Sequence, residues 1–184
     1  MAIKDYIQIT ENNLPLETIS SFIKFCKRLN YEKGSLVRGD VDESVRKVKI
    51  HSLSRFSSSL TEVHWCNLLY AVIQKNIVSY NNKFKYFHVD KITDISVLKY
   101  EDSGHYDWHT DHCAAIPRTI SVILLFNNDY KGGTLSFYDA VKDEKIDIET
   151  KPGRMIMWPS NFIFPHKVNP VEQGIRYSVV SWAV

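Results

Sequence analysis

The stretch "RTISVILLFN" (residues 118–127) is short, apolar and rich in β-branched residues, which is typical of a buried strand. Turn residues separate it from six similar stretches: "FKYFHVD" (84–90), "ISVLKY" (95–100), "GTLSFYD" (133–139), "KIDIET" (145–150), "GRMIMWP" (153–159) and "IRYSVVSWAV" (175–184). No helical pattern connects one stretch to the next, so the sheet is expected to be mainly antiparallel. A sandwich or jelly roll is therefore favoured over a parallel α/β fold.

Two amphipathic helices are expected before these strands. Residues 13–30 place Ile19, Phe22 and Cys26 at helical spacing, with Pro15 near the start, where its missing N–H costs little. "SLTE" (59–62) has the capping-box pattern, and the helix after it should end near "SYNNK". Its expected apolar face consists of Val63, Cys66, Tyr70, Ile73 and Ile77.

The chain is expected to fold as one domain, 1–184, of mainly β class with flanking helices. A helical N-terminal part would span 1–82 and a jelly-roll core about 83–184, with the helices packed on one sheet. Residues 31–58 are charged and show no clear period, so they are expected to form a long loop with a short strand around Val48–Ser52.

Composition and charge narrow the function classes. The formal net charge of +2 at pH 7 is too small to predict a nucleic-acid or membrane-surface partner. No apolar run reaches the length of a membrane span, and the N-terminus lacks the apolar core of a signal peptide. Three scattered cysteines, Cys26, Cys66 and Cys113, fit free thiols in a reducing compartment. A cytoplasmic protein is expected.

"GHYDWHTDH" (104–112) places three of the chain's seven histidines beside two aspartates. His109 and Asp111 are two residues apart, so at a strand end both side chains would point to the same face. His166, which follows the strand "GRMIMWP", is the best-placed third ligand. Two histidines and one carboxylate leave three positions of a metal open, which suits non-haem Fe(II) with a bidentate co-substrate and oxygen.

Other interpretations of this cluster stay open. A His-X-Asp pair is common, and a jelly-roll module that holds a metal without turnover fits the same residues. A zinc protease would carry a glutamate where Tyr106 stands, and Glu101 is the only close general base for a zinc hydrolase. A Ser-His-Asp triad lacks its Gly-X-Ser-X-Gly elbow. His105 and His112 have no strict spacing partner and are expected to be structural or to support the ligands.

Arg176 lies ten residues beyond His166. The turn-like "NPVEQG" between them predicts a hairpin that would bring the two residues together. Period two along the last strand puts Arg176 on one face with Ser178 and Trp182. A guanidinium buried on that face needs an anionic partner. A bound carboxylate and a salt bridge to one of the chain's own acids are both compatible with the sequence.

Taken in order, these elements resemble the iron(II)- and 2-oxoglutarate-dependent dioxygenases, in particular the prolyl 4-hydroxylase-like branch. The resemblance runs from about Tyr100 to the C-terminus and includes the ligand pair, the Gly-Gly of "GGTLSF", the Pro-Gly of "KPGRMIMW", the distal histidine and the arginine. It implies a double-stranded β-helix, or jelly-roll, fold. It also implies hydroxylation of a substrate with O2 and 2-oxoglutarate.

The resemblance further implies roles for single residues. His109, Asp111 and His166 would bind Fe(II), and Arg176 would hold the distal carboxylate of 2-oxoglutarate. The implied co-substrate contacts are Tyr100, Ser178 and Trp182. Ascorbate is a further candidate cofactor. Nucleic-acid demethylases of this fold carry a second arginine and an asparagine that "RYSVV" lacks, so a nucleic acid is not the expected substrate.

The expected substrate is a peptidyl proline, because the resembling branch acts on one. A free amino acid or another small molecule is the alternative. The loop 31–58 and the segment "HCAAIP" after Asp111 are candidate lids over the site. The candidate peptide-groove residues are Tyr31, Arg38, Arg46, Tyr106 and Trp108.

Overall fold

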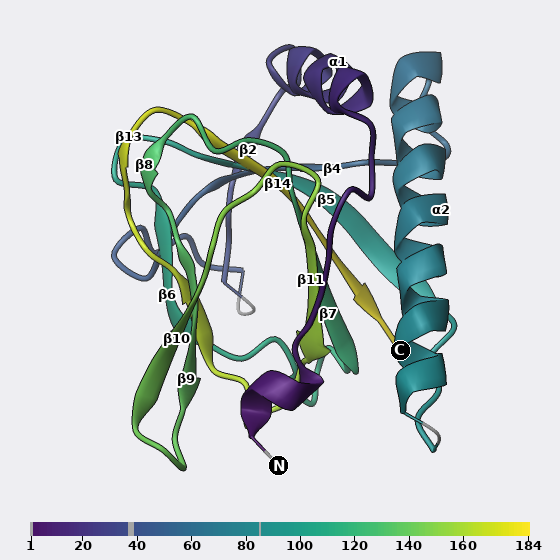
Figure 1. The fold of residues 1–184 in the computed structure, drawn as a ribbon. Coiled ribbons are helices and arrows are strands. Elements are labelled where there is room, and N and C mark those ends of the chain that lie inside the picture. The colour runs from purple at the N-terminus through teal and green to yellow at the C-terminus, as the bar shows by residue number, and fades with distance from the viewer. Residues whose placement is uncertain (1, 37–38, 85) are drawn as a thin grey trace.

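The computed structural model describes residues 2–36, 39–84 and 86–184. Two sheets face each other, and two helices cover the outer face of the larger sheet (Figure 1). The elements in chain order are η1 (Ile3–Tyr6), β1 (Gln8–Thr10), α1 (Leu16–Cys26), β2 (Glu32–Lys33), β3 (Arg46–Lys47), β4 (Lys49–Ser52), α2 (Leu60–Lys83), β5 (Ile92–Tyr100), β6 (His105–His109), β7 (Ile120–Leu125), β8 (Lys131–Gly132), β9 (Leu135–Asp139), β10 (Glu144–Ile148), β11 (Met155–Pro159), β12 (His166–Val168), β13 (Val171–Gln173) and β14 (Arg176–Ala183).

Strands from distant parts of the chain are neighbours in both sheets. The larger sheet has seven strands in the order β1-β11-β7-β14-β5-β4-β2, and the smaller has five in the order β10-β9-β12-β6-β3. Strands β13 and β8 form a separate two-stranded ribbon. Every pairing between these strands is antiparallel. The prediction of a mainly β jelly-roll fold with flanking helices is confirmed.

Side chains along the strands of the larger sheet point alternately to its two faces, and each face packs against a separate hydrophobic core. In β7, Ile120, Val122 and Leu124 face the helices, whereas Ile123 and Leu125 face the smaller sheet. The helix-side cluster consists of Leu14, Ile19, Phe22, Cys26, Leu53, Trp65, Cys66, Leu69, Ile73, Ile77, Tyr80, Val89, Ile92, Ile95, Val97, Ile120, Val122, Leu124, Phe126, Met155, Met157, Tyr177, Val179 and Ala183. The inter-sheet cluster consists of Ile3, Ile7, Val48, Leu98, Tyr100, Ile123, Leu125, Leu135, Phe137, Ile148, Ile156, Trp158, Phe164, Val168, Val171, Val180 and Trp182.

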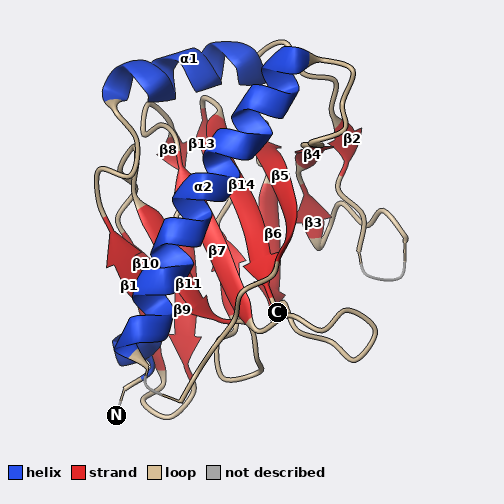
Figure 2. Ribbon diagram, turned by 90° about the vertical axis from the view of Figure 1, so that its right-hand side faces the viewer, coloured by secondary structure: helices blue, strands red, loops and turns tan. Residues whose placement is uncertain are grey.

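Helix α2 lies across the larger sheet, and α1 crosses near its upper end (Figure 2). The buried stripe of α2 consists of Trp65, Cys66, Leu69, Ile73, Asn76, Ile77 and Tyr80. Val63 and Tyr70, which were expected on the buried face, are only half-buried, because the stripe is centred on Leu69 instead. Half of the predicted capping box is present, since the Ser59 hydroxyl accepts a hydrogen bond from the Glu62 N–H at 3.4 Å. The Glu62 carboxylate instead accepts from the Ser54 N–H at 3.0 Å.

Helix α1 is confirmed but shorter than the expected 13–30. After Cys26 the chain turns, and the N–H of Arg28 bonds to the carbonyl of Phe25 at 2.9 Å. The hydroxyl of Tyr31 donates to the Cys26 carbonyl at 2.9 Å, which supplies the helix end with a partner from outside the helix. This contact turns the chain toward β2.

Two predictions about strands are wrong. The segment 84–90 does not form a strand in its described part; Phe84 and Phe87 pack on Tyr80, and the Asn81 side chain bonds to both backbone groups of Val89. The aromatic residues there anchor a turn. The expected hairpin of β12 and β14 is also absent, because these strands belong to opposite sheets.

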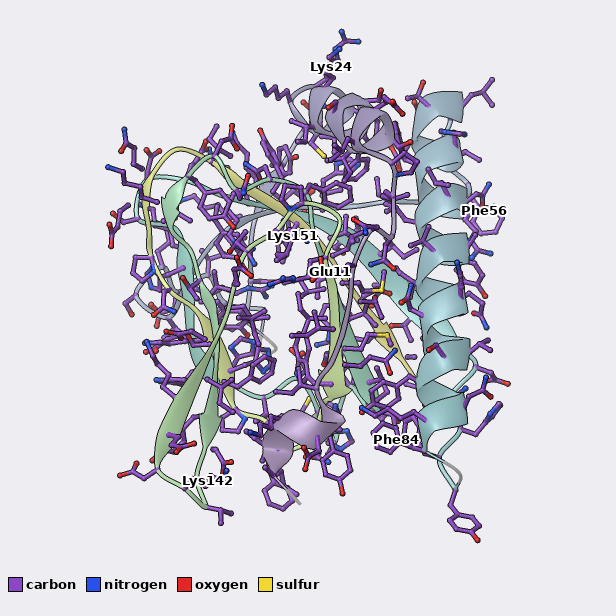
Figure 3. All side chains as sticks on the ribbon, in the orientation of Figure 1. Glu11, Lys24, Phe56, Phe84, Lys142 and Lys151 are labelled. Carbon is purple, nitrogen blue, oxygen red and sulfur yellow. The ribbon has the colours of Figure 1, made fainter. Side chains whose placement is uncertain are left out.

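The N-terminal part supplies more strands than its sequence pattern indicates. The short strand expected around Val48–Ser52 is confirmed as β4, while β1 and β3 add further edges to the larger and smaller sheets. Beyond β1, the Glu11 carboxylate lies 3.5 Å from Lys151 Nζ (Figure 3) and 2.8 Å from Arg154 Nη2. None of the described helices combines the length and apolar character that a membrane crossing requires.

Candidate metal centre

His109, Asp111 and His166 meet between the two sheets. Strands β6 and β12 are antiparallel neighbours, and their register sets His109 opposite His166. Nε2 of His109 lies 3.7 Å from Oδ1 of Asp111, and Nε2 of His166 lies 3.5 Å from Oδ2. One ligand atom from each residue lies within 4.8 Å of the others, which is close enough for one cation to bind all three.

Both histidines present Nε2 to this centre because Nδ1 is used elsewhere. Nδ1 of His109 bonds to the carbonyl of Asp107 at 2.7 Å, and Nδ1 of His166 bonds to that of Phe164 at 3.0 Å. A carbonyl only accepts, so Nδ1 carries the proton and Nε2 keeps its lone pair. Burial, together with the neighbouring His166, lowers the pKa of His109 to about 3, so its ring is neutral, as metal ligation requires.

Asp111 is ionised although it is buried. Burial raises its pKa, but the two histidines and the Ser121 hydroxyl outweigh that effect and hold the pKa below its usual value. The Ser121 hydroxyl donates to Oδ2 of Asp111 at 2.5 Å and lies 2.8 Å from the Ser160 hydroxyl. Ser121 was not expected from the sequence. The only signal was a hydroxyl between Ile120 and the apolar run "VILLF" (122–126).

A β-bulge in β6 shapes the wall beside the ligands. Three steps from Tyr106 to His109 pair with only two steps from Val168 to His166, so β6 carries one extra residue. The bulge turns Tyr106 and His109 to the same face. Their rings stack with centres 3.5 Å apart, which fixes the orientation of the imidazole.

The candidate ligands open onto a cavity between the sheets, with about 400 Å³ of empty space that includes its opening to solvent. Most of its wall comes from the inter-sheet cluster, so the cavity is largely apolar. The lining residues are Arg46, Leu98, Tyr100, Tyr106, His109, Asp111, Ile123, Leu135, Trp158, His166, Val168, Val180 and Trp182. This set includes four residues that the sequence analysis associated with the co-substrate or the substrate.

Arg176 is fully buried and has no anionic partner among the described residues. Its Nη1 donates to the Ser178 hydroxyl at 2.8 Å, while Nε and Nη2 bond to nothing. The guanidinium carbon lies 5.1 Å from the centre of the Tyr100 ring, which lines the cavity. Unsatisfied donors on a buried cation are costly, so the position fits a bound anion better than a structural role. No ion pair supports the salt-bridge alternative.

The Gly-Gly pair leaves room for this arginine. Gly132 and Gly133 have φ angles of +73° and +65°, in the left-handed region that favours glycine. A Cβ on Gly133 would lie 3.0 Å from Cδ of Arg176, and one on Gly132 would lie 2.1 Å from the Pro170 carbonyl oxygen. The turn after β8 therefore needs both glycines to close against the buried guanidinium.

The remaining expected groove residues lie apart from the cavity or outside the described residues. Trp108 points to the outer face of the smaller sheet, where it is 40% exposed and contacts Tyr138 and Lys167. Tyr31 packs against the helix-side cluster. Arg38 lies outside the described residues.

The other two histidines of the cluster bond to backbone. His105 contacts the carbonyls of Ser103 and Ser44, and His112 contacts that of Arg118 at 2.8 Å. Neither belongs to the three-residue group. Arg118 itself was missed: its guanidinium carbon lies 3.4 Å from the centre of the Trp182 ring. A cation directly before an apolar strand is weak evidence, because many strands begin that way.

A scan against family models connects this geometry to a known group. Residues 95–184 match the 2OG-Fe(II) oxygenase superfamily. This part of the chain, just under half of its length, is similar to that superfamily. The family uses Fe(II) and 2-oxoglutarate, and the residues present fit both groups. The Nε2 atoms of two imidazoles and a carboxylate suit Fe(II), and the orphaned donors of Arg176 suit a carboxylate of 2-oxoglutarate.

Two curated relatives match about half of the chain. A PKHD-type hydroxylase of Pseudomonas fluorescens is 30% identical over 93 residues, which are 45% of this chain and 39% of that protein. Prolyl 3-hydroxylase 2 of Homo sapiens is 31% identical over 99 residues, which are 50% of this chain and 14% of that protein. The matches thus span less than half of either relative.

Solved structures show the same fold over nearly the whole chain. A prolyl hydroxylase from Trichoplax adhaerens, in complex with a hypoxia inducible factor peptide, has a TM-score of 0.80 at 18% identity and covers 97% of this chain and 83% of its own. A Pseudomonas putida prolyl-4-hydroxylase has a TM-score of 0.77 at 18% identity and covers 99% and 96%. The fold that this chain shares with these two structures therefore includes its N-terminal helices.

Proposed function

We propose that this protein is an Fe(II)- and 2-oxoglutarate-dependent hydroxylase that acts on a peptidyl proline. The observation that carries the proposal is the combination of His109, Asp111 and His166 with the buried, unpaired Arg176. A metal-binding module without turnover, or a zinc hydrolase, has no use for that arginine. The prolyl hydroxylases among the relatives support a peptidyl proline, and a free amino acid is the alternative substrate.

Each side chain has a separate task in this proposal. His109, Asp111 and His166 would hold Fe(II), and Arg176 with Ser178 would bind the distal carboxylate of 2-oxoglutarate. With both groups bound, the site would supply the oxidising chemistry that places an oxygen atom on a substrate C–H bond. Burial raises the pKa of Tyr100, so its hydroxyl stays protonated and can donate to the co-substrate. The apolar wall would exclude water.

The test of the reaction class is spectroscopic. Fe(II) and then 2-oxoglutarate are added without oxygen, and a visible charge-transfer band is expected in the wild type but not in Asp111→Ala. The absence of a band in the wild type would contradict the proposal. Succinate formation is then measured with proline-containing peptides and with free amino acids. Turnover with free amino acids alone would replace the peptidyl substrate by the alternative.

Two minor proposals accompany the main one. A cytoplasmic location is supported by the free thiols of Cys26, Cys66 and Cys113.

Ascorbate is proposed as an added reductant. Succinate formation with and without ascorbate tests that role, and equal rates over many turnovers would remove it.

A further inference from the structure

Two arginines stand where the metal cavity meets a second hollow. Arg46 and Trp182 line both the cavity and an adjoining groove of about 1000 Å³, and Arg118 lines the groove. The groove is polar, in contrast to the cavity behind it. A substrate that reaches the metal from this groove therefore passes Arg46 and Arg118.

Each guanidinium is connected to the candidate metal ligands through one aromatic ring or one short contact. The Arg46 guanidinium carbon lies 4.5 Å from the centre of the Tyr106 ring, and that ring stacks on His109. The Arg118 guanidinium carbon lies 3.4 Å from the centre of the Trp182 ring, and its Nη1 lies 3.5 Å from the Asp111 carbonyl. The stacking holds both cations in fixed orientations beside the site.

Neither guanidinium is paired with a carboxylate of the described residues. Arg46 donates to the Ser35 carbonyl through Nη1 at 2.6 Å, and its Nε is buried without a partner. Arg118 is half-buried and forms no ion pair with a described carboxylate, although the charges of Asp111 and Asp94 act on it from a distance. Partly desolvated cations without a paired anion are unfavourable, so both positions favour a bound carboxylate.

The other charged groups of the groove do not supply that partner. Asp94 of β5 and Glu32 of β2 line the groove, but neither forms an ion pair with either arginine. Lys33 is paired with Glu43 at 2.8 Å, and His51 of β4 faces Glu62 at 3.6 Å. The proposed 2-oxoglutarate site is separate from these two arginines. Its anchor, Arg176, is fully buried and forms no described hydrogen bond with Arg46 or Arg118.

We propose that Arg46 and Arg118 bind a carboxylate of the substrate, next to the proline that is presented to the metal. This inference rests on the proposed function and names its substrate class: peptides in which the proline neighbours an acidic side chain or carries the C-terminal carboxylate. Both sources offer the same planar pair of oxygens, which two guanidinium groups can bind through charge-assisted hydrogen bonds. Peptides without a nearby carboxylate leave the two cations unpaired.

The test compares peptides that differ only in this charge. The protein is loaded with Mn(II) and 2-oxoglutarate, and the affinity of each peptide is measured by calorimetry. One pair contains Pro-Asp against Pro-Asn, and a second pair ends in proline as the free acid against the amide. We expect the charged member of at least one pair to bind about tenfold more tightly or better. Which pair shows the difference identifies the source of the carboxylate.

Variants assign that difference to the two arginines. Arg46→Gln and Arg118→Gln should each bring the ratio of acid-peptide to amide-peptide affinity close to one. Arg118→Lys keeps the positive charge, so it should retain part of the wild-type preference for the acid. Arg55→Gln is the matched control, because Arg55 also stacks on a ring, with its guanidinium carbon 3.6 Å from the centre of Tyr70, but lines neither hollow of the site. The control should keep the wild-type ratio.

The outcomes separate this inference from the proposed function. Equal affinity of acid and amide peptides in the wild type, or a ratio that survives both glutamine variants, overturns the carboxylate site while the hydroxylase proposal stands. Failure of Mn(II) and 2-oxoglutarate to bind contradicts the hydroxylase proposal. The peptide pairs are also measured on the metal-free protein, where the arginines alone must still produce the preference for the acid.

Discussion

The helix-side and inter-sheet cores are built from alternate residues of the same strands, yet they differ in the charge that they bury. On the helix side, β14 contributes Tyr177, Val179 and Ala183 to a closely packed apolar cluster, beside Ser181, an uncharged hydroxyl that has no described partner. On the other side, the same strand places Arg176, with two buried nitrogen atoms that bond to nothing. Because such groups cost stability, the difference indicates that one face of the sheet is packed for folding and the other is kept for binding.

The largest expected effect comes from removing a candidate ligand. His166→Ala should abolish binding of Fe(II), because only His109 and Asp111 would remain as protein ligands and two ligands hold the metal too weakly. Titration with Fe(II) or Mn(II) under anaerobic conditions measures this. His105→Ala is the control, since His105 bonds only to backbone carbonyls, and it should bind metal normally. Normal metal binding by His166→Ala would place the metal elsewhere.

Arg176→Met should change 2-oxoglutarate binding and the stability of the folded protein in opposite directions. Loss of the guanidinium is expected to weaken 2-oxoglutarate binding by about 30- to 1000-fold, as for other buried charge partners. The cofactor-free protein should become more stable, by about 1–4 kcal/mol, because a methionine of similar volume replaces an unpaired buried charge. Titration of the charge-transfer band and urea unfolding measure the two effects. A loss of stability on this substitution would mean that Arg176 is structural after all.

A pair of identical substitutions compares the two cores directly. Leu69 is fully buried in the helix-side cluster, whereas Leu98 borders the metal cavity. Leu69→Ala should cost stability near the upper end of about 2–5 kcal/mol and leave 2-oxoglutarate binding unchanged. Leu98→Ala should cost less, because its surroundings are already open on one side, but should weaken co-substrate binding. Denaturant unfolding of both variants checks the order, and the reverse order would refute the distinction between the cores.

The sequence predicted those parts of the molecule in which local pattern and final structure agree. Six of the seven expected strands appear, because their β-branched and aromatic runs satisfy the alternation that a two-faced sheet requires. The grouping of His109 and Asp111 with His166 was also predictable, since spacing and residue type restrict the ligand set. The seventh expected strand, 84–90, shows that aromatic residues can equally anchor a turn.

Features that depend on distant contacts were not predictable in the same way. Strands β1 and β3 have two or three residues each and no pattern of their own, and they exist because β11 and β6 offer free edges. The bulge that brings Tyr106 onto His109 depends on how β6 pairs with β12. Arg118 stacks on Trp182, which lies far along the chain, near the C-terminus. Each of these contacts requires the complete fold.

The smallest effect predicted here concerns the residue that orients Asp111. Ser121→Ala removes the hydrogen bond to Oδ2 while leaving all three candidate ligands in place. Outer partners of metal ligands typically contribute about 10- to 100-fold in metal affinity, so the apparent Kd for Mn(II) should rise within that range. Ser121→Thr, which keeps the hydroxyl, should restore most of the affinity. A purely packing role for Ser121 would reverse this result, because alanine fits the buried site more easily than threonine does, and the alanine variant would then bind metal as well as the wild type.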